Sequence, residues 1–171
     1  PYAAPDIPVR VAKVTRPYPA EHKPQRHDLE KWVRRPERPR GAFARWYLAR
    51  MEIRAGRKDR ARQLFSDLRR TGFKSRAIAP ALLEFAEFEM GDGHFDETLA
   101  ILDEARLLHP EPELLTRINF LSARVQYLAK RFDTATAAFE QIAQRDSPWA
   151  KPALFNASSG WMQLGDHVRF V

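Results

Sequence analysis

The stretch Ala79–Pro112 decides the fold, and it reads APALLEFAEFEMGDGHFDETLAILDEARLLHPEP. Its first half places apolar side chains at helical spacing, at Leu82, Phe85, Ala86 and Met90. Its second half does the same at Leu99, Leu102 and Ala105, with Ile101 and Leu108 beside them. The segment 91–93, Gly-Asp-Gly, interrupts the helical pattern, and Pro110 ends it. The stretch therefore predicts two amphipathic helices in 34 residues, and a unit of this length suggests a repeat.

The turn of this unit recurs along the chain at a nearly constant spacing. It falls at Gly56, Gly93, Lys130 and Gly165, so that successive turns are 37, 37 and 35 residues apart. A small residue stands seven positions before each turn, at Ala49, Ala86, Ala123 and Ser158. Another stands five positions after the first three turns, at Ala61, Thr98 and Ala135, and is followed four positions later by Phe65, Leu102 and Phe139. Because small residues let two helices approach closely, this register predicts stacked helix pairs.

The pattern resembles the tetratricopeptide repeat (TPR) family, whose motif has small residues in both helices, Gly at the turn and Pro at the end. The resemblance covers residues 42–171, with repeats at about 42–75, 79–112, 116–148 and, incomplete, 151–171. It implies an all-α fold, a right-handed solenoid of antiparallel helix pairs. Two residues depart from the motif: Arg45 stands where the family usually has a large aromatic, and Lys130 replaces Gly at the third turn. The alternative is an irregular helical bundle with accidental periodicity.

The two ends of the chain raise separate expectations. The first 40 residues hold 8 of the 13 prolines, no glycine, and 10 Lys or Arg against 5 Asp or Glu. Proline at this density favours extended backbone, so residues 1–41 are expected to form an extended, basic, Pro-rich arm. The arm either packs along a partner or along the repeats, or it is a disordered linker. At the other end, the second helix of the fourth repeat is expected to begin near Asp166 and to continue past Val171.

A short helix is expected within the arm, near residues 28–35. Asp28 can cap it, Leu29, Trp32 and Val33 share one face, and Pro36 ends it. This helix either caps the first repeat or forms a docking motif centred on Trp32. The candidate arm contacts are Trp32, Arg34, Arg35 and Arg38.

The resemblance also implies where a partner would bind, because in TPR proteins the first helix of each repeat lines a concave groove. The groove positions combine arginines, which pair with carboxylates, and aromatics, which provide buried anchor area. The candidates are Trp46, Arg50, Arg54, Arg117, Phe120, Arg124, Tyr127 and Phe155. They favour a peptide or helix with acidic and hydrophobic side chains, whereas a Lys–Asn carboxylate clamp is not predicted. The alternative is that several of these aromatics pack against neighbouring helices or the arm.

Several classes of function find no support in the sequence. The chain has no Cys, so a disulfide, a thiolate metal site and a Cys nucleophile are excluded. The five histidines lack metal-ligand spacing, no phosphate-binding Gly loop is present, and no run of apolar residues is long enough to span a membrane. We therefore expect no enzymatic activity, no metal and no cofactor. The compartment stays open: cytoplasm is slightly favoured, with a bacterial periplasm as the alternative if a signal or anchor was removed.

Three functions remain. The leading hypothesis is a scaffold that binds a partner protein in the groove. A second is a structural subunit of a larger assembly, anchored by the arm. A third is nucleic-acid binding through the arm, which the net charge of +7 suggests. The remaining 131 residues carry 19 Lys or Arg against 17 Asp or Glu, and this near-neutral balance argues against the third.

Overall fold

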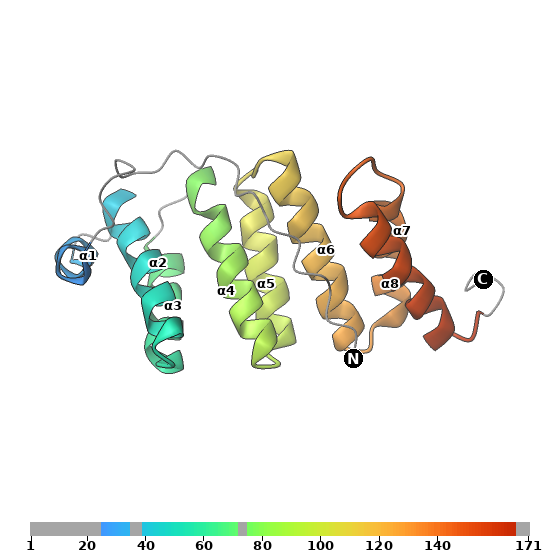
Figure 1. The fold of residues 1–171 in the computed structure, drawn as a ribbon, viewed down its shortest axis with the longest axis horizontal. Coiled ribbons are helices and arrows are strands. Elements are labelled where there is room, and N and C mark those ends of the chain that lie inside the picture. Colours follow the sequence, from blue (N-terminus) through green and yellow to red (C-terminus); the bar gives the residue numbers. More distant parts are fainter. Residues whose placement is uncertain (1–24, 35–38, 72–74, 167–171) are drawn as a thin grey trace. The chain divides into compact units, whose positions relative to one another are not determined.

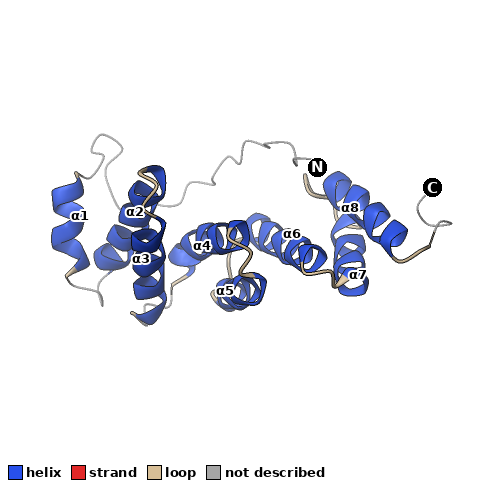
Figure 2. Ribbon diagram, turned by 90° about the horizontal axis from the view of Figure 1, so that it is seen from below, coloured by secondary structure: helices blue, strands red, loops and turns tan. Residues whose placement is uncertain are grey.

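The computed structural model describes residues 25–34, 39–71 and 75–166, which are almost entirely helical (Figures 1 and 2). The helices are α1 (Arg26–Val33), α2 (Pro39–Arg54), α3 (Lys58–Arg70), α4 (Ala79–Gly91), α5 (Phe95–Leu107), α6 (Pro112–Leu128), α7 (Phe132–Ala143) and α8 (Ala150–Gln163). A 3₁₀ helix, Arg76–Ile78, precedes α4, and the described ranges contain no strand. The expected fold class, all-α with TPR-like antiparallel helix pairs, is confirmed.

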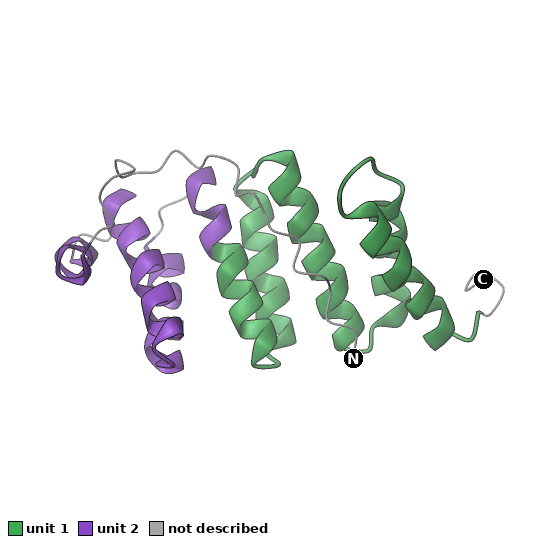
Figure 3. Ribbon diagram, in the orientation of Figure 1, with its two compact units in different colours: residues 1–6, 82–171 green, residues 7–81 purple. Residues whose placement is uncertain are grey.

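The chain divides into two compact units (Figure 3). We call residues 7–81 the amino-terminal unit and residues 82–171 the carboxy-terminal unit. In the amino-terminal unit α2 pairs with α3, and α1 packs against α2. Each of the three helices buries apolar side chains, among them Leu29 of α1, Leu48 of α2 and Phe65 of α3. The short helix expected near residues 28–35 is thus present at Arg26–Val33 and contributes to a core.

In the carboxy-terminal unit successive helices pack in sequence, α5 on α6, α6 on α7 and α7 on α8. One core cluster joins the last three of these helices through Phe120, Ala123, Ala135, Phe139, Ile142, Ala153 and Ala157. The ring of Phe120 lies 5.4 Å from that of Phe139 and 4.8 Å from that of Trp149, measured between centroids. The predicted small residues Ala123 and Ala135 are fully buried, as the close approach of paired helices requires.

The four predicted turn positions share one backbone conformation. Gly56, Gly93, Lys130 and Gly165 have φ of 71°, 82°, 61° and 77°, in the left-handed region. At each turn the next residue donates its N–H to the carbonyl five positions earlier, for example Arg57 to Glu52 at 2.9 Å and Arg131 to Gln126 at 2.9 Å. This is the hydrogen bond of a Schellman motif, which ends a helix and favours Gly at the left-handed position. The register predicted from sequence is therefore confirmed, including at Lys130, where Gly is missing.

Arg45, the other departure from the motif, is buried and bonded to backbone. Its guanidinium donates to the carbonyl of Gly41 at 3.1 Å and to that of Val33 at 2.8 Å. Val33 is the last residue of α1, so Arg45 ties the end of α1 to α2. Phe at this position could make neither bond, and Trp or Tyr has a single donor, so only the guanidinium can bond both carbonyls.

Two other expectations concern residues outside the described ranges. They are the extended arm at residues 1–24 and a second helix of the fourth repeat beyond Asp166. The first of the four expected repeats has its first helix begin at Pro39 rather than at residue 42, and the last described helix ends at Gln163.

Candidate protein-binding surface

The groove positions of the amino-terminal unit lie on α2, and the structure buries one of them. Trp46 is only 7% exposed, with its ring centroid 6.3 Å from that of Phe43 and 5.9 Å from that of Tyr47. Its indole therefore belongs to the core and offers little area to a partner. Arg50 places its guanidinium 6.0 Å from the Trp46 ring centroid, a cation–π arrangement, and Arg54 is exposed at the end of the helix. Arg50 and Arg54 thus contribute to the surface of α2, together with Ile53, which is 38% exposed.

The buried carboxylate of Glu52 on α2 links α1 to the turn between α2 and α3. Glu52 is 1% exposed and accepts hydrogen bonds from Arg57, which precedes α3, and from Arg26, the first residue of α1. The hydrogen bond from Arg57, together with the one from Arg26, lowers the pKa of Glu52 below its usual value, although burial acts in the opposite direction. Glu52 therefore stabilises the packing of α1 and of the α2–α3 turn, and it is not available to a ligand.

Two groove candidates of the carboxy-terminal unit are already engaged within the protein. Arg117 on α6 forms an ion pair with Glu87 on α4, with 2.5 Å between guanidinium nitrogen and carboxylate oxygen. Phe120 is 5% exposed and forms part of the core cluster with Phe139 and Trp149. The expectation that Phe120 lines the groove is therefore replaced by a structural role, as it is for Trp46.

The remaining candidates of this unit do lie at the surface. Arg124 of α6 is exposed, and Tyr127 is half-buried with its ring 5.1 Å from that of Phe132. Phe155 of α8 is 54% exposed. Because α6 and α8 contribute to the same core cluster, these side chains belong to neighbouring helices.

Helix α8 carries an unusually apolar surface. Leu154, Met162 and Leu164, at the end of the helix, are exposed like Phe155. The hydroxyl groups on this helix are satisfied internally, because Ser158 donates to the carbonyl of Leu154 and Ser159 to that of Phe155, each at 3.1 Å. With their donors used in this way, the two serines add little polarity to the surface.

The arm candidates are only partly described. Trp32 is half-buried on α1, and Arg34, the first residue after this helix, is exposed. Arg35 and Arg38 lie outside the described residues. Their expected contacts remain predictions.

Charge is unevenly distributed between the two units, which the overall composition conceals. The described residues of the amino-terminal unit, 25–34, 39–71 and 75–81, include 14 Lys or Arg and 5 Asp or Glu. Those of the carboxy-terminal unit, 82–166, include 7 Lys or Arg and 14 Asp or Glu. The near-neutral balance of the chain after residue 40 thus conceals a strongly basic unit and a strongly acidic one.

Within the described ranges, no three His, Asp or Glu side chains are grouped so that they could hold a metal ion. His94, at the second turn, instead contacts the buried carboxylate of Glu89, with 2.5 Å between Nδ1 and Oε2. Of the helices that the structure describes, none combines the length and the apolar character needed to cross a bilayer.

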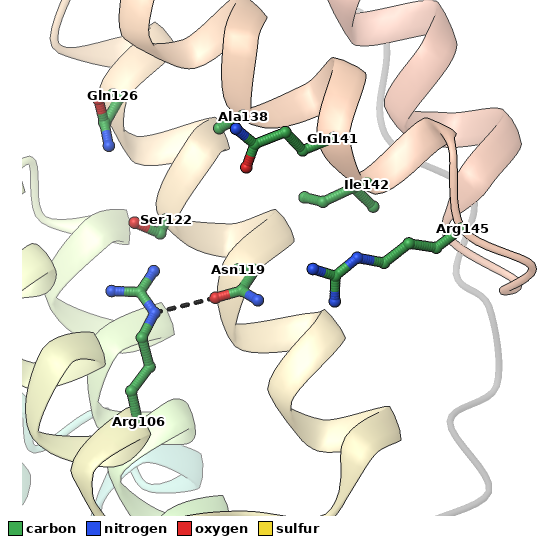
Figure 4. Close-up of a pocket in the computed structure, with 8 residues that line it drawn as sticks. All are labelled: Arg106, Asn119, Ser122, Gln126, Ala138, Gln141, Ile142 and Arg145. Carbon is green, nitrogen blue, oxygen red and sulfur yellow. Dashed lines mark hydrogen bonds between the residues drawn. The ribbon is translucent and has the colours of Figure 1, made fainter.

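A polar cavity in the carboxy-terminal unit had not been expected from the sequence. It lies among α5, α6 and α7 and is lined by Arg106, Asn119, Ser122, Gln126, Ala138, Gln141, Ile142 and Arg145 (Figure 4). The sequence contains a signal for this cavity, which appears when successive repeats are aligned. Asn119 and Ser122 stand 37 residues after the buried Leu82 and Phe85, so polar residues occupy positions that are apolar one repeat earlier.

Comparison with known proteins finds the same fold among solved structures. No protein-family model matches the sequence, and neither does any curated protein. Among solved structures, this chain is similar to a Podosopora anserina protein assigned as a kinesin light chain, whose TPR-like repeats are nearly identical to one another. The TM-score is 0.68 at 16% sequence identity. The alignment covers 85% of this chain and 80% of that one; for a single-substitution variant of the same protein the values are 85% and 79%. The chain therefore has a TPR-like helical-repeat fold.

Proposed function

We propose that the protein is a non-enzymatic scaffold that binds a segment of a partner protein through the groove positions of its repeats. The observation that carries this proposal is the exposed surface of α6 and α8 in the carboxy-terminal unit. Phe155 and Met162 offer apolar area, and Arg124 offers a guanidinium to a carboxylate. Large exposed apolar side chains gathered on one helix of a repeat protein are typical of an interaction surface.

The chemistry of this surface favours a segment that combines apolar and acidic side chains. An apolar side chain would pack against Phe155 and Met162, whereas an acidic one would pair with Arg124. Arg50 and Arg54 give the amino-terminal unit a similar preference for acidic groups. Arg117 contributes less, because Glu87 already neutralises it.

The test is a selection from a random peptide library displayed on phage against the full chain, followed by affinity measurement on synthetic peptides by fluorescence anisotropy. We expect enriched peptides to combine apolar and acidic residues, and Phe155→Ser and Arg124→Glu each to weaken binding about tenfold or more. The matched control is Leu107→Ser, which removes a side chain that is 75% exposed on α5, the second helix of its repeat. The proposal fails if no peptide is enriched, or if Leu107→Ser weakens binding as much as Phe155→Ser.

A second candidate function is nucleic-acid binding by the amino-terminal unit, and its excess of nine positive charges favours it. Helix α3 alone contributes Lys58, Arg60, Arg62, Arg69 and Arg70, although Arg62 and Arg70 pair with acidic residues of the same helix. Binding of duplex DNA by the full chain should then weaken steeply with salt and be reduced by Arg60→Glu. Binding that is equally strong in the charge-reversed variant would exclude this function. Anchoring of an assembly by the arm remains a prediction.

A further inference from the structure

The cavity among α5, α6 and α7 has a volume of about 210 Å³ and a lining that is mostly polar (Figure 4). Helix α6 contributes Asn119, Ser122 and Gln126, and α7 contributes Gln141. Two of the helices, α5 and α7, are second helices of their repeats, so this cavity is distinct from the groove surface proposed above. Its volume is below that of sites for drug-sized ligands, roughly 300–1,000 Å³, and suits a single functional group.

The register of the repeats explains why a cavity exists here. Asn119 and Ser122 occupy the positions of Leu82 and Phe85 in the preceding repeat, and both of those side chains are buried. Replacing Phe by Ser removes most of the volume that would fill the space, and Ser122 itself remains buried. A polar residue at a core position costs stability unless it finds a partner. Such violations of the folding pattern tend to mark functional positions.

Two arginines supply the electrostatics of the cavity. The Nε of Arg106 donates to the side-chain oxygen of Asn119 at 2.9 Å, which fixes the plane of the guanidinium. Another nitrogen of Arg106 pairs with Asp103, whose carboxylate is 68% exposed on the outer surface of α5. Arg145, just after α7, extends its guanidinium toward the cavity from the opposite side (Figure 4). Arg145 is exposed, and among the described residues no carboxylate forms an ion pair with it.

Asp103 already neutralises the charge of Arg106, so Arg145 supplies the positive charge of the cavity and Arg106 supplies hydrogen-bond donors. Together they favour an anion between them, because each guanidinium donates hydrogen bonds in a fixed planar array that matches an oxyanion. The amides of Gln126 and Gln141 and the hydroxyl of Ser122 can add further donors. The surrounding unit carries 14 acidic against 7 basic residues in its described part, so a polyanion would be repelled at longer range. We propose that this cavity binds one small oxyanion, a carboxylate or a phosphoryl group, between Arg106 and Arg145.

The test is a titration of the ¹⁵N-labelled full chain, followed by ¹H–¹⁵N correlation spectra. Sodium phosphate and sodium acetate are the two probes, and sodium chloride at matched ionic strength is the reference. We expect saturable shifts at the backbone amides of Arg106, Asn119 and Arg145 with at least one probe. Saturation with phosphate alone would assign a phosphoryl site, and saturation with acetate alone a carboxylate site. Shifts that never saturate, or that chloride reproduces, would show screening only and would overturn the proposal.

Matched substitutions separate this site from the groove. Arg145→Gln should weaken binding of the saturating probe about tenfold, since a charge-assisted hydrogen bond is lost. Lys151→Gln removes an exposed cation of α8 that neither lines the cavity nor belongs to the groove candidates, and it should leave probe binding unchanged. Ser122→Leu should fill the cavity and abolish probe binding while the thermal midpoint is maintained or raised. If Ser122→Leu keeps full affinity, or if Lys151→Gln weakens binding as much as Arg145→Gln, the site is not this cavity.

Discussion

Gly160 of α8 faces Thr136 of α7, and adding a single methyl group there tests the packing of the two helices. A Cβ built on Gly160 would lie 2.0 Å from Oγ1 of Thr136, 3.1 Å from its Cβ and 3.4 Å from its Cγ2. Both residues are buried. In the substitution Gly160→Ala, the new Cβ would therefore overlap with Oγ1 of Thr136.

The magnitude follows from how far the neighbours can yield. Rotation of Thr136 about χ1 can move Oγ1 away, but its Cβ is fixed by the backbone of α7 and stays at 3.1 Å. The helices must therefore separate by a few tenths of an ångström, and such overpacking costs about 1–3 kcal/mol. Ala is favoured over Gly inside a helix by about 1 kcal/mol, which offsets part of this cost. We expect a net loss of about 0–2 kcal/mol in the free energy of unfolding.

The assay is urea unfolding followed by circular dichroism at the helical band, with Gly91→Ala as the matched control. Gly91 ends α4, and a Cβ there meets no atom within 4 Å, so the control should be neutral or stabilising. Thr136→Ala in the Gly160→Ala background removes Oγ1 and Cγ2 and should recover part of the loss. If Gly160→Ala is as stable as Gly91→Ala, the α7–α8 interface is not packed as described here, and the reasoning is refuted.

Three further predictions use the same unfolding assay. Lys130→Gly should stabilise the protein by about 1 kcal/mol, because Lys130 holds a φ of 61° that costs a residue with a side chain; a loss of stability would contradict this. Phe120→Ala should cost about 3–5 kcal/mol and Phe155→Ala less than about 0.5 kcal/mol, and equal effects would show that the core and surface assignments are wrong. Since hydrogen bonds from Arg57 and Arg26 lower the pKa of Glu52, the stability that they confer should be present above the usual carboxyl pKa of 4.5 and be lost as pH falls through the lowered value. Glu52→Gln should flatten that decline between neutral and acidic pH, and an unchanged pH profile would exclude Glu52 as its source.

The repeat register could be predicted from the sequence because its determinants are local. A left-handed turn residue and small residues at fixed offsets act within one helix pair, so no knowledge of distant neighbours is needed. Even Lys130, whose side chain disfavours a positive φ, adopts the predicted conformation because the flanking helices determine it.

Surface exposure could not be predicted in the same way, because it depends on groups outside the repeat motif. Phe120 is buried by Trp149, which stands in the segment before α8 and has no place in the motif. Arg45 finds its acceptor at Val33, in a helix that precedes the first repeat. A motif position thus predicts the place of a residue on its helix, whereas neighbouring residues outside the motif determine whether its side chain is exposed.

The distribution of charge could not be predicted for a different reason. Taken as one body, the repeat region has nearly balanced charges. Once the chain is divided at residues 81 and 82, the described part of one unit has nine excess positive charges and that of the other has seven excess negative ones. Charge counted per unit is therefore the quantity that bears on partners.

The third repeat shows how a poor match to a motif can itself be informative. If Asn119 and Ser122 were random drift at core positions, the structure should have closed over them, since unfilled space and unpaired polar groups both cost stability. Instead the space stays open, and Arg106 is held by Asn119 while Arg145 extends toward the same cavity. Substituting Ser122→Leu decides between the two explanations. If the variant is more stable but no longer binds an anion, the polar residues lower stability in order to form an anion site. If it is more stable and anion binding is unchanged, they are only a packing defect of the core.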